Sequence, residues 1–156
     1  MRALAAGLVV ASMAAAACSL HQSANASSAR TATPVTGPSL APASGALDAE
    51  VAMPPGFPSD FPIYPHARLT AAAAFASSAE TAWGMEWETL DSYGAVGAFY
   101  TKQLNQGDWT IKVDTATTAS FKATFSRKSD TGVDGTLAAN PDVTLTKILV
   151  SLVVPS

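Results

Sequence analysis

The stretch AWGMEWETLDSYGAVGAFYTKQLNQG, residues 82–107, decides the fold because it encodes a strand followed at once by a helix. Trp83 and Trp87 belong to an alternation of large and small or polar residues, which predicts a half-buried strand with one apolar face. Asp91 or Ser92 can cap the helix that follows. Its apolar positions recur at helical spacing up to a terminating glycine: Val96, Phe99, Tyr100, Leu104 and Gly107.

Further strands are predicted on both sides of this unit. Alternation over 69–75 predicts a strand before it, although alanine is a poor strand former and a helix over 67–76 competes. Strands over 109–113, 121–125 and 143–153 are predicted after it, with 129–135 and 140–142 read as turns. We therefore expect an α+β fold: a five-stranded, mostly antiparallel sheet in the element order ββαβββ, with one helix packed on one face. The helix is expected to meet a core of Trp83, Trp87, Trp109, Ile111, Phe121 and Phe125.

The last predicted strand is apolar on both of its faces. Leu145, Leu149 and Val153 lie opposite the face that alternation assigns to the core. A sheet with one helix should leave its second face polar. We expect these three residues to be covered internally by the Phe57–Tyr64 segment; the alternative is that they form a surface for a partner.

The folded region opens with the proline-rich sequence DFPIYPHA, residues 60–67, and its aromatic residues are expected to lie along the domain surface. Together with Phe99-Tyr100 and Gly107-Asp108-Trp109, this sequence resembles small exported bacterial domains of unknown function that open with P-x-Y-P-G-A. The resemblance covers 57–156 and departs at His66, where glycine is usual. It implies a strand pair, a helix and further strands, and no particular activity.

The N-terminus predicts export. An apolar run follows Arg2 and extends to Ala17, too short for a helix that spans a bilayer, so residues 1–17 are interpreted as a signal peptide. The sequence up to Cys18 resembles the lipobox of bacterial lipoproteins, except at Ala15, where leucine is usual. The resemblance implies cleavage before Cys18 and its lipidation, which anchors the protein to a membrane facing the periplasm or the cell exterior. Ordinary cleavage after an Ala-x-Ala site, leaving a free thiol, is the alternative.

Composition divides the rest of the chain into two parts. Residues 18–55 are rich in Ser, Ala, Thr and Pro, which predicts a flexible tether, and 56–156 form the single expected domain. With 9 basic and 12 acidic residues the chain has a net charge of −3, which gives no basis for binding nucleic acid. Cys18 is the only cysteine, so no disulfide can form within the chain.

No catalytic residue, metal site or cofactor is predicted. His66 has no identifiable nucleophile near it in sequence, and residues 130–135 lack the full ligand pattern of a calcium loop. Glu86 and Glu88 share one strand face and could support a hydrolase, but a solvated position opposite the tryptophans explains them better.

The sequence therefore favours a lipid-anchored, non-enzymatic envelope protein with a binding or structural domain, whose possible partner is another protein of the envelope. One alternative is a domain that binds a glycan or peptide on the polar sheet face, through Thr110, Lys112, Lys122 and Thr124. A hydrolase using scattered carboxylates is the less favoured alternative. The sequence leaves the choice between inner and outer membrane open.

Replacing Cys18 tests the anchor. Cys18→Ser removes the thiol that would carry the acyl chains, so we expect lipid labelling and retention in the membrane fraction to be lost. Labelling with a radioactive or clickable fatty acid, followed by fractionation, measures both. A Cys18→Ser protein that still sediments with membranes would contradict the lipid anchor.

Overall fold

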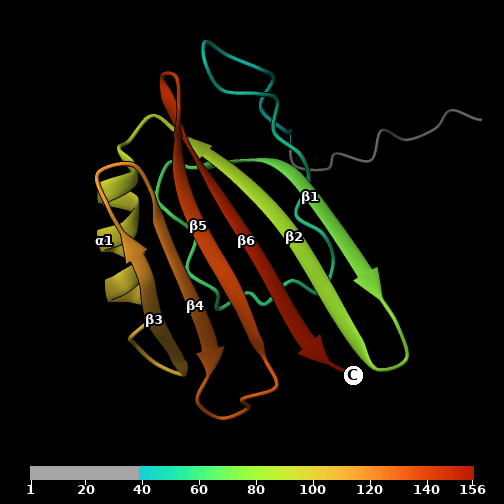
Figure 1. Cartoon of the computed structure of the whole chain (residues 1–156). Coiled ribbons are helices and arrows are strands. Elements are labelled where there is room, and N and C mark those ends of the chain that lie inside the picture. The colour runs from blue at the N-terminus through green and yellow to red at the C-terminus, as the bar shows by residue number, and fades with distance from the viewer. Residues whose placement is uncertain (1–38) are drawn as a thin grey trace, which may run out of the picture. The chain divides into compact units, whose positions relative to one another are not determined.

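Residues 39–156 are described by the computed structural model, and within this range the chain forms a six-stranded antiparallel sheet and one helix (Figure 1). The strand order is β1-β2-β6-β5-β4-β3, so β6 at the centre joins the β1–β2 hairpin to the β3–β4–β5 meander. The elements are β1 Arg68–Ala76, β2 Glu80–Thr89, α1 Tyr93–Gln103, β3 Trp109–Ala116, β4 Phe121–Arg127, β5 Asp134–Asp142 and β6 Leu145–Pro155.

The α+β class, the antiparallel pairing and the single helix on one face agree with the sequence prediction, but the expected number of five strands is wrong. The missed strand is β5, whose glycine and Asn-Pro-Asp sequence had suggested turns. Gly135 is needed there because a Cβ at this position would lie 2.1 Å from the carbonyl oxygen of Ser151 and 2.5 Å from the ring of Phe125. Neighbouring strands approach closely at Gly135, and the need for a residue without a side chain at this point outweighs the tendency of glycine to form turns.

The helix α1 forms as expected. The Ser92 hydroxyl accepts a hydrogen bond from the Ala95 amide at 3.3 Å, which caps the N-terminus. Gly97 allows the helix to approach the sheet closely, because a Cβ there would lie 2.8 Å from the ring of Phe121. In the described part of the chain, no helix has the length and apolar character needed to span a membrane.

The predicted core is confirmed. Trp83, Trp87, Trp109, Phe121 and Phe125 are all buried, and Ile111 packs against them. The entry segment, defined here as Phe57–Tyr64, was expected to lie along the surface or to cover the second face of the last strand. Both expectations are wrong, because Phe61 is only 3% exposed and packs 5.6 Å from Trp109 and 5.2 Å from Phe125, between ring centroids. The segment thus completes the core on the face that also carries α1.

An arginine fastens the entry segment to the β3–β4 hairpin. The Arg127 guanidinium lies 2.6 Å from the Asp60 carboxylate and 3.2 Å from that of Asp108, and stacks 4.4 Å above the Trp109 ring. Desolvation is the largest single influence on the pKa of Arg127 and lowers it. The hydrogen bonds and charges of Asp60 and Asp108 together outweigh desolvation, so the pKa of Arg127 is raised. Hydrogen bonds from Ser129 lower the pKa of Asp108.

Two non-glycine residues adopt positive φ. His66, at φ 61°, occupies the position where the family resemblance had suggested glycine, and this backbone conformation is the one that glycine tolerates best. Val143, at φ 50°, lies in the two-residue turn between β5 and β6 and is fully exposed. A β-branched side chain in this conformation is strained and, at Val143, gains nothing from burial.

Replacing Val143 should therefore stabilise the domain. Asparagine tolerates the left-handed conformation, so we expect Val143→Asn to raise the free energy of unfolding by about 1 kcal/mol, measured by urea denaturation. The matched control is Val133→Asn, which removes a buried side chain and should destabilise. An unchanged or lowered stability of Val143→Asn would show that the turn carries no relievable strain.

Candidate functional site

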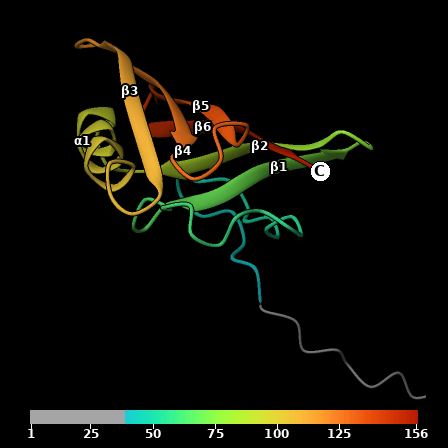
Figure 2. The same cartoon turned by 90° about the horizontal axis from the view of Figure 1, so that it is seen from below.

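The sheet face opposite α1 is called here the outer face. Figure 2 shows that the sheet bends: β3 rises away from the plane of β1 and β2, while α1 lies on the other side of the sheet. The register of the strands places side chains of alternate residues on this face, including Glu86, Glu88, Lys147, Leu149, Ser151 and Val153.

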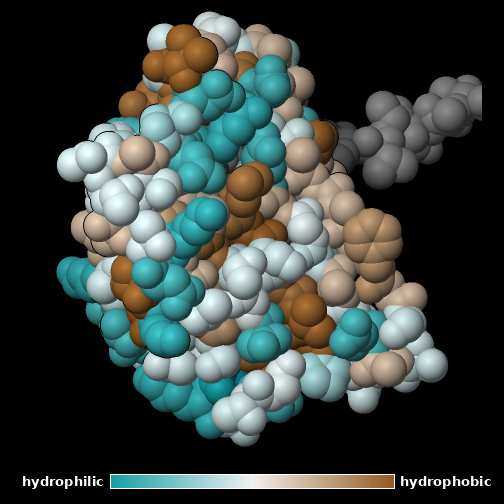
Figure 3. Space-filling model, in the orientation of Figure 1, coloured by the Kyte–Doolittle hydropathy of each residue, from teal (hydrophilic) through white to brown (hydrophobic). Residues whose placement is uncertain are grey.

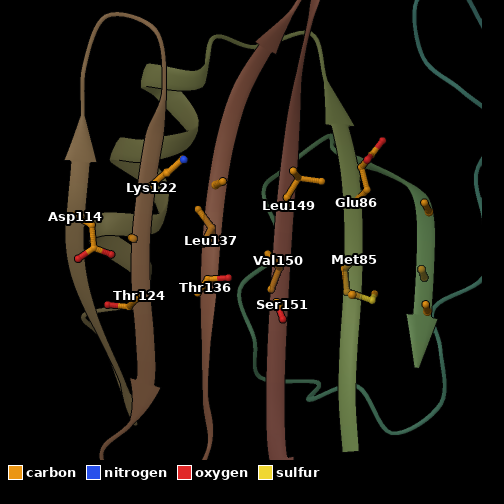
Figure 4. A pocket seen from close by; sticks show the side chains of 16 residues that line it. Met85, Glu86, Asp114, Lys122, Thr124, Thr136, Leu137, Leu149, Val150 and Ser151 are labelled. Atoms are coloured by element: carbon orange, nitrogen blue, oxygen red, sulfur yellow. The ribbon is translucent and has the colours of Figure 1, made fainter. Parts of the chain in front are cut away.

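The bend leaves a hollow of ≈ 710 Å³ across the middle of the outer face. Its floor is lined by small residues of neighbouring strands, of which Ala73, Gly84 and Ser151 are directly paired across β1, β2 and β6; the others are Ala71 and Ala138. Leu149 projects from the central strand, with Met85 and Glu86 to one side and Leu137 and Lys122 to the other (Figure 4). In the space-filling view, brown apolar patches on this face alternate with teal polar ones (Figure 3).

Charged groups lie at the two sides of the hollow. Lys122 and Asp114 line it on the β3–β4 side, and Glu86 lines it on β2. A second depression of ≈ 550 Å³ continues from it toward Thr110 and Lys112, and the two share Thr124, Thr136 and Ser151. The outer face therefore combines an apolar floor with a charged rim.

The residues singled out from the sequence come together on this one face. Leu149 is 40% exposed and lines the hollow, Val153 lines the adjoining depression, and Leu145 lies near the β5–β6 turn. Of the polar candidates, Lys122 and Thr124 line the hollow, and Thr110 and Lys112 line the depression. The apolar and the polar candidate surfaces, which the sequence treated as alternatives, are parts of one surface.

Sequence reasoning missed the small residues of the floor. Ala71, Ala73 and Ala138 had no chemistry to draw attention to them, and the only signal was their position on strand faces without bulky neighbours. Their role depends on which strands are adjacent, since Ala138 lies beside Leu149 only because β5 pairs with β6.

An ion cluster occupies one end of the outer face, and among its four side chains Glu88 is the buried one. Lys147 Nζ lies 3.3 Å from Glu86, 3.6 Å from Asp142 and 3.8 Å from Glu88. The hydrogen bond to Glu86, more than the other carboxylates, raises the pKa of Lys147. The expectation that both glutamates lie in water is wrong for Glu88, which is 1% exposed. Its carboxylate also accepts a hydrogen bond of 2.8 Å from the Asp48 amide.

Glu88 is covered by a part of residues 18–55, which the sequence predicted to be a flexible tether. The Arg68 guanidinium donates to the carbonyl oxygens of Pro42 and Asp48, and the Val51 amide donates to the carbonyl of Leu69 at 2.9 Å. The expected tether boundary at residue 55 is therefore too late, because the chain is hydrogen-bonded to strand residues from Pro42 onward.

The remaining candidates do not assemble into a reactive centre within residues 39–156. His66 is an exposed turn residue, and no group of three or more histidine, cysteine or acidic side chains in this range could hold a metal ion. The carboxylates of Glu86 and Glu88 are paired with Lys147, which suits a structural ion cluster. Cys18, the predicted lipidation site, lies outside the described residues.

Comparison of the chain with protein-family models, with curated proteins and with solved structures found no match.

The ion cluster makes a stability prediction. Lys147→Met leaves the buried carboxylate of Glu88 with one amide donor, so we expect it to lower the free energy of unfolding. Adding Glu88→Gln should recover part of that loss, because the uncompensated charge is then removed. Lys112→Met is the matched control: the lysine is 83% exposed and 3.8 Å from Asp114, so its loss should change stability by less than about 0.5 kcal/mol. Equal effects of the two lysine variants would show that the ion cluster around Glu88 does not stabilise the domain.

Proposed function

We propose that this protein is a lipid-anchored cell-envelope protein whose domain is a non-catalytic binding module, and that the outer face binds a segment of a protein partner. The anchor part of the proposal rests on the apolar run that ends at Cys18. The binding part rests on one observation above all, the apolar hollow on the outer face.

The size and lining of the hollow support binding. Ligand sites are concave, mostly apolar and commonly ≈ 300–1,000 Å³, with a few polar groups that fix orientation. The hollow of ≈ 710 Å³ falls within this range. Leu149 is a large apolar side chain left in contact with water beside a floor of alanine and glycine. Covering it would remove apolar surface from water, which favours association.

The charged rim favours a peptide segment as the ligand. Lys122 and Asp114 on one side and Glu86 on the other can pair with opposite charges or backbone groups of an extended segment. A glycan is favoured less, because sugar binding usually relies on exposed aromatic rings, whereas no aromatic residue lines the hollow and Trp83, Trp87 and Trp109 are all buried in the core. The partner expected is therefore a protein segment with apolar side chains between charged ones.

Substituting the exposed leucine tests the binding surface. Leu149→Asp places a charge in the hollow and should weaken binding of the partner by about tenfold or more, the effect expected for a central contact residue. Because Leu149 is partly exposed, this variant should remain folded by circular dichroism. Leu152→Asp, at a buried position on the same strand, is the control that should unfold the domain.

The partner is first captured in cells by a photo-cross-linking amino acid at position 149. Ile63, an exposed apolar residue of the entry segment outside the hollow, is the control position. Support requires an adduct specific to position 149 and a purified partner that binds the unmodified chain more tightly than Leu149→Asp. Identical adducts from both positions, or equal affinities for the two chains, would refute the outer face as the binding surface.

A further inference from the structure

Strand β1 is an edge of the sheet, and its second half is unusually open. Every residue from Ala71 to Ala76, with sequence AAAAFA, is exposed, and Phe75 is 70% exposed. None of these residues is charged, and none is proline. Long, apolar and uncharged edge strands are templates for pairing with another strand.

The backbone of this edge has free hydrogen-bonding groups. The Ser77 amide donates to the Glu80 carbonyl, so this pair at the β1–β2 turn is of the hydrogen-bonded type. Hydrogen-bonded and non-hydrogen-bonded pairs alternate along an antiparallel ladder. It follows from the register that Phe75, Ala73 and Ala71 bond to β2, whereas the amides and carbonyls of the alternate residues Ala72, Ala74 and Ala76 point away from it. Within residues 39–156, no other segment bonds to these outward groups.

The edge strand β3 and the first part of β1 are protected against pairing with another strand, whereas the second half of β1 is not. At the opposite edge, β3 carries Lys112 and Asp114, and its register shifts between Val113 and Thr115. Charges and bulges of this kind are the usual devices against edge pairing. The first part of β1 is covered, since Leu69 accepts the hydrogen bond from Val51.

We propose that the open half of β1 pairs with β1 of a second copy of this chain, antiparallel and about a twofold axis, so that two sheets join into one. About a twofold axis, β1 of one copy faces β1 of the other, so two identical sets of side chains must be able to lie next to each other. The stretch from Ala71 to Ala76 meets this condition because alanines face alanines and no like charges are brought together.

The side-chain pattern supports this occupant. Of the registers that bring the outward backbone groups of the two copies opposite one another, the two centred on Ala73 and on Ala74 pair the open stretch with itself most fully. In either register the exposed ring of Phe75 lies opposite an alanine of the other copy, Ala71 or Ala73, on the outer face. Aromatic rings gain from packing on such cross-strand neighbours, so pairing covers the most exposed aromatic residue of the domain. Because Ala71 and Ala73 also line the hollow, the two hollows would lie side by side across the axis.

Sedimentation velocity of the full chain measures the association directly, with Cys18→Ser present so that acyl chains cannot drive it. A reversible monomer–dimer equilibrium is expected. Ala73→Lys places two like charges close together across the axis and should weaken the dimer by about tenfold or more. Ala116→Lys makes the same change on the protected edge strand β3 and should leave association unchanged. A chain that remains monomeric at all concentrations, or equal effects of the two variants, would overturn the proposal.

Cysteine cross-linking identifies the strand involved. With Cys18→Ser present, Ala73→Cys and Ala74→Cys each introduce the only thiol of the chain. One of them should form an intermolecular disulfide on mild oxidation, depending on the register, because paired strands bring symmetry-related Cα atoms within the roughly 4.4–6.8 Å that a disulfide requires. The control Ala116→Cys should not cross-link. Failure of both β1 variants, or a β1 thiol that couples only to a different protein, would exclude pairing between two copies.

Discussion

The packing of Phe61 between the sheet and the helix is the contact on which the rest of the domain depends. Its ring lies 6.3 Å from Tyr100 of α1, 5.6 Å from Trp109 of β3 and 5.2 Å from Phe125 of β4, between centroids. It also contacts Phe57, which in turn packs against Trp83 of β2 at 6.1 Å. Two side chains of an irregular segment, Phe57 and Phe61, thus link both halves of the sheet through their shared core.

This contact commits the entry segment to the same side of the sheet as α1. The buried apolar side chains of the core face are therefore covered by a helix and a proline-rich segment. Within residues 39–156, the Ala41–Val51 region is the part that remains to approach the outer face, and its hydrogen bonds reach one end, at Arg68 and Glu88. These described residues therefore leave the middle of the outer face open.

The shape of the outer face follows from the strands themselves. Both edge strands, β1 and β3, contain a register shift, and such irregularities bend a strand and increase its twist. Small residues at Ala71, Gly84 and Ala138 leave the inside of the bend unfilled. A concave face with an apolar floor is thus the product of local backbone irregularity and side-chain size, and it needs no separate binding domain.

Much of the architecture was predictable because it depends on local periodicity. Alternation placed Trp83, Trp87 and Phe125 on the core face, and Ser92 marked the start of the helix. The strand β5 was missed because Gly135 and Pro141 resemble turn residues, whereas pairing with both β4 and β6 holds Gly135 in a strand and pairing with β6 holds Pro141 there. The positions of Phe61 and Glu88 could not be predicted, since their burial depends on segments distant in the chain.

The sequence by itself determined which side chains share a strand face, where the helix begins, and the signal around Cys18 that predicts export and lipidation. Only the tertiary structure decided which strands are neighbours, and therefore that Leu149 of β6 stands over a floor built from β1, β2 and β5. It also decided that β1 is an edge with an open second half. The reason is that periodicity is a property of adjacent residues, whereas strand order is set by contacts between residues far apart in the chain.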